Sequence, residues 1–205
     1  MLGNMPDTSN RKAQILQTAA ALFRERGYQA ASMRDIATAM HIEAASLYHH
    51  IKSKEEILEI ICFDMAEQFL STIVEVNDIY FNAEEKLRMA ILNHVRLITQ
   101  NQERSAVFLH EWRSLPEVSL NSFLALRNQY ENGFKQIVKE GIEEDIFGQV
   151  EPKFAVLSIL SSVNWINEWY KPDGKMNAEE IAKNISDFVL GGLRKKLVTD
   201  LGYKP

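Results

Sequence analysis

The stretch AASLYHHIKSKEEIL, residues 44–58, places two helical patterns directly after one another. The first pattern begins with small residues and sets Leu47, Tyr48 and Ile51 at helical spacing. Ser53 and the glutamate three positions later form an S-x-x-E capping box, which predicts the start of another helix. A short helix with a small, polar front is therefore predicted immediately before a long helix.

The residues before this stretch predict two more helices. Apolar side chains fall on one face of residues 11–26, and Gly27 stands where a left-handed C-terminal cap is expected. Ser32 and Asp35 can form an acidic variant of the capping box, so a second helix is predicted to begin directly after Ser32 and to end by His41. Two short helices joined by a turn of about four residues form a helix-turn-helix.

The remainder of the chain keeps the helical period, and no stretch alternates in the manner of a strand. Pro152 suits a first helical turn, and Asn177 followed by Glu180 predicts a cap for the last helix. Further helices are predicted over residues 53–76, 83–100, 103–113, 117–140, 152–170 and 177–197. The predicted fold class is therefore all-α, with about nine helices.

Charge divides the chain into two parts. The whole chain carries a formal net charge of −5, but its first 54 residues hold more basic than acidic side chains. We therefore predict a basic three-helix head, residues 1–54, that is joined by the long fourth helix to an acidic helical body, residues 55–205. The negative total argues mildly against a nucleic-acid partner, whereas the basic head favours one.

Composition and motifs exclude several classes of protein. Cys62 is the single cysteine, so no internal disulfide forms, and the first residues lack the features of a signal peptide. The longest apolar stretch, residues 154–166, is shorter than the roughly 20 residues that span a bilayer. We therefore expect a cytoplasmic protein that does not enter a membrane.

Sequence signals of enzyme chemistry are absent. The chain has no G-x-S-x-G motif, no glycine-rich phosphate loop and no H-E-x-x-H pair, so we predict no catalytic residues and no cofactor. His49 and His50 are adjacent and point in different directions on a helix, and neither Cys62 nor His41 adds a ligand at metal spacing. No metal site is predicted.

The short helix after the turn has the properties of a DNA-reading helix. Such a helix needs small or polar side chains at its front, because large ones hold its backbone away from the base edges. Ala44, Ala45 and Ser46 provide this front. Tyr48, His49, Lys52 and Lys54 follow at positions from which hydroxyl, imidazole and ammonium groups can reach phosphates.

Residues 11–58, RKAQILQTAAALFRERGYQAASMRDIATAMHIEAASLYHHIKSKEEIL, resemble the amino-terminal domain of the TetR/AcrR family of bacterial transcriptional regulators. The ILxxAxxLFxExGY, SMRDIA and SLYHHIxSKEEIL blocks occur in the order and spacing of that family. The resemblance implies a homodimeric repressor with two heads that bind an operator in double-stranded DNA and helical bodies that bind a small-molecule effector. It also implies that the DNA contacts are made by Ser32, Arg34, Ala45, Ser46, Tyr48, His49 and Lys54.

The chain departs from the family pattern in the turn. His41 stands where glycine is common, and the left-handed conformation is open to histidine more often than to most residues, so we expect the turn to survive. Glu43 and Ala44 stand where a hydroxyl cap and a lysine are common. Three alternatives follow for Glu43: it caps the helix, accepts a hydrogen bond from cytosine N4, or weakens DNA binding.

The family resemblance places the dimer contact on the last two long helices, as a four-helix bundle. Residues 154–166 are apolar almost all round, more than one core face requires, which indicates a buried partner surface. The alternative is a helix buried within its own body. The predicted dimer residues are Phe154, Leu157, Leu160, Ile181, Ile185 and Phe188.

The body also contains candidates for an effector pocket, which is typically apolar with a few polar groups. The predicted pocket residues are Phe108, His110, Trp112, Arg113, Tyr130, Phe134, Trp165 and Trp169, and the polar candidates are His110, Glu111, Arg113 and Asn164. The alternative is that these aromatic side chains only pack the core.

The HEWRSLP segment is most similar to family members that regulate lipid and acyl-coenzyme A metabolism, so a fatty acyl or acyl-coenzyme A effector is expected. Arg113 suits either a carboxylate or a phosphate. An amphipathic xenobiotic is the alternative effector, and a helical interaction module without DNA binding is the rival class. In the predicted mechanism the effector moves the fourth helix and changes the separation of the heads, which requires different effector affinities in the two states.

Overall fold

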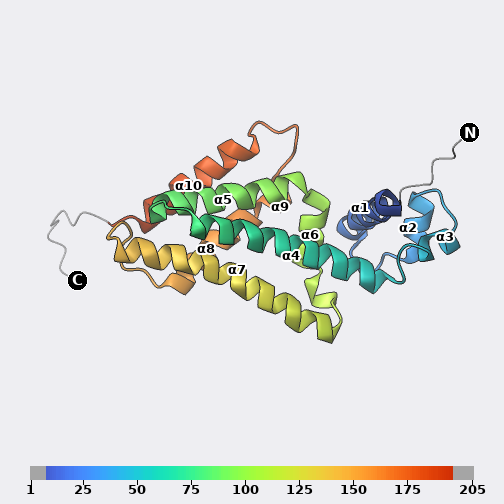
Figure 1. Cartoon of the computed structure of the whole chain (residues 1–205). Helices are drawn as coiled ribbons and strands as arrows, with labels where there is room; N and C mark the ends of the chain where they lie inside the picture. The colour runs from blue at the N-terminus through green and yellow to red at the C-terminus, as the bar shows by residue number, and fades with distance from the viewer. Residues whose placement is uncertain (1–7, 196–205) are drawn as a thin grey trace, which may run out of the picture. The chain divides into compact units, whose positions relative to one another are not determined.

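The computed structural model describes residues 8–195, and this part of the chain is all-α as predicted (Figure 1). Its helices are α1 (Thr8–Arg26), α2 (Met33–Ala39), α3 (Ala44–Tyr48), α4 (Lys54–Asp78), α5 (Ala83–Gln100), α6 (Gln102–His110), the 3-10 helix η1 (Trp112–Ser114), α7 (Glu117–Glu143), α8 (Pro152–Asn164), α9 (Ile166–Trp169) and α10 (Ala178–Leu193). An isolated bridge between Phe147 and Arg194 is the one β-type pairing within residues 8–195.

Contacts divide the chain into two compact units. Among the described residues, the first unit is formed by residues 8–70 and 100–128, and the second by residues 71–99 and 129–195. Helices α4 and α7 contribute residues to both units. The predicted division between a head, residues 1–54, and a body, residues 55–205, is a functional one and stays a prediction.

Helix α1 supplies the centre of the first unit. Its apolar face, with Ile15, Ala19 and Phe23 buried, packs chiefly against α6, and Figure 1 shows α2 and α3 beside it. The N–H of Gly27 donates to the Phe23 carbonyl at 2.9 Å, and the φ angle of Gly27 is 82°. This is the left-handed cap predicted at Gly27, where an L side chain would be strained.

Capping explains where several helices begin. Ser32 and Asp35 form the predicted box at α2, and an equivalent box, confirmed as predicted, starts α10. At α4 the Ser53 hydroxyl accepts from the Glu56 N–H at 3.2 Å, but the Glu56 carboxylate accepts from the N–H of Lys52 at 2.7 Å. The first half of that predicted box is therefore confirmed, and the second half reaches one residue further back.

Three predicted helices end earlier than expected. The helix predicted over residues 103–113 is split, because α6 ends at His110 and the chain tightens into η1. The helix predicted over residues 152–170 is divided into α8 and α9 at Trp165. The last helix ends at Leu193, because the backbone then pairs with residues 146–148: Lys195 N–H donates to the Ile146 carbonyl at 3.2 Å.

The second unit buries one face of α5 against the other helices. Leu87, Ile91, Val95 and Ile98 on this face are inaccessible to solvent. Helix α7 approaches the end of α4 closely, because a Cβ added at Gly133 would lie 2.5 Å from Ile73 Cγ1. The glycine therefore permits a helix contact that a larger residue would push apart.

Candidate functional site

Helices α2 and α3 form a helix-turn-helix. The turn is closed by backbone hydrogen bonds: His41 N–H donates to the Thr38 carbonyl at 3.1 Å, and Ile42 N–H donates to the Ala37 carbonyl at 3.0 Å. His41 has a φ angle of 54°. The expectation that histidine adopts the left-handed conformation here, where the family commonly has glycine, is confirmed.

A small core fixes α3 and decides which of its side chains face outward. Leu47 and Ile51 are buried together with Ile36 of α2. Ala45 is exposed, and Tyr48 has 52% of its surface exposed. Tyr48 is therefore not a packing residue of this core, and α3 presents a small front and an aromatic ring to solvent.

The structure narrows the alternatives for Glu43. This residue occupies the N-cap position of α3, but its side chain makes no capping hydrogen bond. The interpretation that Glu43 replaces the hydroxyl cap is therefore wrong. The contact to cytosine and the weakening of DNA binding stay predictions.

One cleft of the first unit brings four predicted DNA contacts together. Its volume is about 530 Å³. The predicted contacts that line it are Ser32, Arg34, Tyr48 and Lys54. Lys52, an exposed cation, lines the same cleft. The cleft is thus lined by guanidinium, ammonium and phenol groups, which are the kinds that contact a nucleic-acid backbone, and by one exposed carboxylate, that of Glu55.

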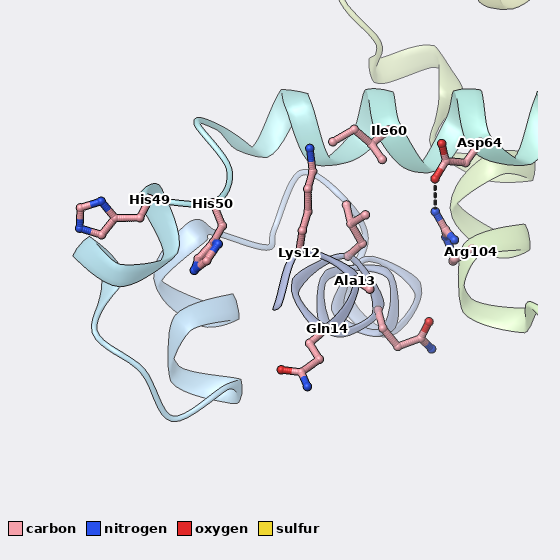
Figure 2. A pocket seen from close by; sticks show the side chains of 10 residues that line it. Lys12, Ala13, Gln14, His49, His50, Ile60, Asp64 and Arg104 are labelled. Atoms are coloured by element: carbon pink, nitrogen blue, oxygen red, sulfur yellow. Dashed lines mark hydrogen bonds and ion pairs between the residues drawn. The ribbon is translucent and has the colours of Figure 1, made fainter. Parts of the chain in front are cut away.

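The other predicted contacts lie outside that cleft. Ala45 and His49 are exposed and Ser46 is half-buried on α3. His49 lines a larger groove of about 1120 Å³ with His50 and Lys12. In Figure 2 the His49 ring is directed away from α1, and the Arg104–Asp64 ion pair, 2.7 Å long, lies on the opposite side of α1.

Two of the predicted contacts have partners within the protein. The Ser32 hydroxyl and N–H donate to Asp35, and these bonds hold the pKa of the Asp35 carboxyl below its usual value. Lys54 Nζ donates to the carbonyls of Tyr28 and Ala31, both at 2.9 Å, and lies 4.3 Å from the centre of the Tyr28 ring. An ammonium has three donors, so one N–H of Lys54 is left for a phosphate.

Three predicted effector residues of the first unit, Phe108, Trp112 and Arg113, belong to an aromatic cluster. Phe108 is buried and packs against Phe123 at 5.6 Å between ring centres. Trp112 stacks on Phe123 at 6.1 Å, and the guanidinium of Arg113 lies over the Trp112 ring at 4.3 Å. His110 is exposed.

In the second unit the predicted effector residues separate into buried and exposed pairs. Tyr130 and Phe134 are buried and meet edge to face at 5.3 Å. Trp165 and Trp169 have 66% and 41% of their surfaces exposed, so these two side chains do not line the interior of the unit.

Sequence reasoning missed a buried histidine beside Tyr130. His94 Nδ1 lies 2.7 Å from the Tyr130 hydroxyl, and His94 Nε2 lies 3.0 Å from Asn164 Oδ1. Asn164 Oδ1 only accepts, so Nε2 donates and Nδ1 accepts from the tyrosine, as one neutral tautomer allows. The sequence signal was a polar residue within the apolar stripe of residues 83–100.

Burial lowers the pKa of His94 to about 3, against a reference value of 6.5. Below pH 6.5 His94 becomes protonated in the unfolded chain but stays neutral in the folded chain. The free energy of unfolding should therefore fall as the pH decreases. We expect a loss of about 2 kcal/mol between pH 6.5 and pH 5. Urea unfolding at fixed protein concentration would measure it. In His94→Gln this part of the pH dependence should disappear, and an identical pH profile for the two proteins would contradict the assignment.

The predicted dimer residues are not equally available. Phe154 and Phe188 have 72% and 81% of their surfaces exposed, and Leu157 is also exposed. Leu160 and Ile181 are buried within the second unit, and therefore offer almost no area to a second copy. Ile185 is half-buried. Between α8 and α10 lies an apolar groove of about 600 Å³, whose lining includes Phe154, Phe188, Gly191 and Gly192.

Residues 8–195 contain neither a cluster of metal ligands nor a membrane-spanning helix. Within that range no three histidine, cysteine or acidic side chains gather as they would to hold a metal ion. None of its helices combines the length and the apolar character needed to cross a membrane.

Comparisons with known proteins cover nearly the whole chain. A family model described as bacterial regulatory proteins, tetR family, matches residues 15–61, and one described as tetracyclin repressor-like, C-terminal domain, matches residues 81–193. The HTH-type transcriptional repressor KstR2 of Mycolicibacterium smegmatis is 28% identical over 194 residues, which cover 92% of this chain and 95% of the relative.

Two solved structures are similar in both fold and sequence. The TetR family transcriptional regulator PfmR from Thermus thermophilus has a TM-score of 0.80 and 34% identity, covering 88% of this chain and 99% of that one. AibR, solved in complex with isovaleryl coenzyme A and operator DNA, has a TM-score of 0.77 and 31% identity, covering 87% and 97%.

Proposed function

The chain belongs to the TetR family of DNA-binding transcriptional regulators, and we propose that it is a homodimeric repressor that an acyl-coenzyme A thioester releases from its operator. The observation that carries DNA binding is the front of α3: Ala45 is exposed there beside Tyr48, next to a cleft lined by Arg34 and Lys54. A helix with this front can approach base edges while neighbouring cations hold the phosphates.

The proposed second copy would cover the exposed apolar surface formed by α8 and α10. Phe154, Leu157 and Phe188 are large exposed side chains on these two helices. Large contiguous apolar patches on a soluble domain mark interaction surfaces. A two-fold dimer would also present two copies of α3 to two half-sites of one operator.

Two observations support a thioester as the effector. AibR, which is similar over most of its length, was solved with isovaleryl coenzyme A. The polar cluster of His94, Tyr130 and Asn164 is uncharged, which suits a neutral carbonyl group and disfavours a free carboxylate.

The proposed effector class is tested on a preformed complex between the protein and fluorescent DNA from upstream of its own gene. Isovaleryl coenzyme A, a long-chain fatty acyl-coenzyme A, the matching free acids and coenzyme A alone would be titrated separately. We expect one thioester to release the DNA, with no release by free acids or coenzyme A. Release by an amphipathic dye alone would favour the xenobiotic alternative, and release by free acids would overturn the thioester proposal.

A further inference from the structure

The loop between α1 and α2 is held by one anionic and one cationic side chain. The N–H of Tyr28 donates to Glu111 Oε1 at 3.1 Å. The carbonyls of Tyr28 and Ala31 accept from Lys54 Nζ at 2.9 Å each. Glu111 therefore binds a donor of the loop while Lys54, the first residue of α4, binds two of its acceptors.

Glu111 lies at the joint between α6 and η1. It is the C-cap of α6, where its N–H donates to the Val107 carbonyl at 2.9 Å, and the N-cap of η1, where its carbonyl accepts from Ser114 N–H at 2.9 Å. The same turn makes a second contact to the loop, since Gln29 Nε2 donates to Ser114 Oγ at 3.2 Å. A shift of η1 therefore acts directly on the loop that leads into α2.

The Glu111 carboxylate also faces the interior of the first unit. Burial, and secondarily the charge of Glu111, raise the pKa of the Cys62 thiol to about 12. Glu111 itself is half-buried. The Glu111 carboxylate, which is anionic and faces inward, is therefore not a direct contact to a DNA phosphate.

Trp112 connects this joint to the aromatic cluster. Its ring stacks on Phe123, while the guanidinium groups of Arg113 and Arg127 lie 4.3 and 4.9 Å from the ring centre. Phe123 also packs against Phe108. Any ligand that displaces these rings would move the residue directly before Trp112.

We propose that Glu111 is a positioning residue for DNA binding. It couples the position of η1 to the position of the loop before α2, and this inference rests on the proposed DNA-binding function. In this role Glu111 fixes Ser32 and Arg34 at the start of α2 relative to the start of α4. The segment predicted as an effector handle thereby acts as a link to the DNA-binding surface.

The direction of the change in DNA affinity distinguishes a positioning role of Glu111 from an effect of its charge. Removing a carboxylate near a polyanion strengthens DNA binding by Coulomb attraction alone. Loss of the hydrogen bond to Tyr28 should weaken it instead, because the N–H loses its acceptor and the loop its anchor. We expect Glu111→Asp, which keeps the charge but shortens the reach, to bind DNA about tenfold more weakly.

Glu111→Gln gives the complementary result, because it removes the charge but keeps an oxygen acceptor at the same distance. Its DNA affinity should equal or exceed that of the unaltered protein. Neither variant should change the dependence of affinity on salt, because Glu111 contacts no phosphate. Glu103→Gln is a matched control on α6, where the carboxylate contacts the side chains of Gln17 and Arg24 on α1.

The experiment is fluorescence anisotropy of the full chain and these three variants, on DNA from upstream of its own gene, across a salt series. Thermal melts by circular dichroism would verify folding. Weak binding by Glu111→Asp together with full binding by Glu111→Gln would support the proposal. Equal binding by all four proteins, or equal weakening by both Glu111 variants, would overturn it and leave the proposed function intact. Absence of DNA binding by the unaltered protein would overturn both.

Discussion

Replacing Ala45 by aspartate should weaken operator binding by about 100-fold or more, since a carboxylate at the front of α3 faces base edges and phosphates at close range. The free energy of unfolding should stay nearly unchanged, because Ala45 is exposed. Anisotropy titration and urea unfolding of the same preparation would measure both quantities.

The control for this variant is Asn121→Asp, which adds the same charge at an exposed position of α7. Only a small loss of affinity is expected there, because exposed charges beyond about 10 Å are largely screened at 0.1 M salt. Equal losses in the two variants would mean that α3 does not enter the groove.

Replacing Phe188 by aspartate should produce a folded monomer that binds the operator about 100-fold more weakly or worse. Phe188 is 81% exposed in the single chain, so the substitution costs the chain itself little, whereas a charge buried in a dimer contact without a partner is expensive. A monomer also loses the gain in affinity, about 10² to 10⁴-fold, that two linked binding sites provide. Light scattering after size exclusion would report the mass, and anisotropy the affinity.

Val118→Asp is the matched control for Phe188→Asp, since Val118 is a similarly exposed apolar residue on α7 of the first unit. It should leave both the mass and the operator affinity unchanged. A dimeric Phe188→Asp protein would show that the surface formed by α8 and α10 is not the contact between copies.

Local chemistry made much of the fold predictable. The bounds predicted for α5, residues 83–100, agree with the structure. The caps at Ser32 and Asn177 were also readable, because each depends on residues only three positions apart. The positive φ angle of His41 followed from its place in the turn.

Contacts between distant residues were not predictable in the same way. His94, Tyr130 and Asn164 come from three helices, and nothing in their spacing indicates that they meet. The bond between Glu111 and Tyr28 joins residues 83 positions apart. A local pattern carries no information on such pairs.

The apolar pattern of the last helices shows a related limit. Periodicity marked both Ile181 and Phe188 as apolar residues of one helix, but Ile181 is buried and Phe188 is exposed. A helix with apolar residues on more than one face is expected to bury more than one face. Only the packing of the folded chain shows which face is buried within the chain and which is left for a partner. Directly after the end of α6, Glu111 and Ser114 likewise contact the distant loop after α1.

The most direct test of the central claim is the affinity of the purified protein for DNA from upstream of its own gene and for an unrelated fragment of equal length. Both would be measured by fluorescence anisotropy over a series of salt concentrations. A DNA-binding regulator with a basic head should bind its own upstream DNA far more tightly than the unrelated DNA, and the logarithm of affinity should fall linearly with the logarithm of salt concentration. Equal affinity for the two fragments, or no binding at low salt, would contradict the account.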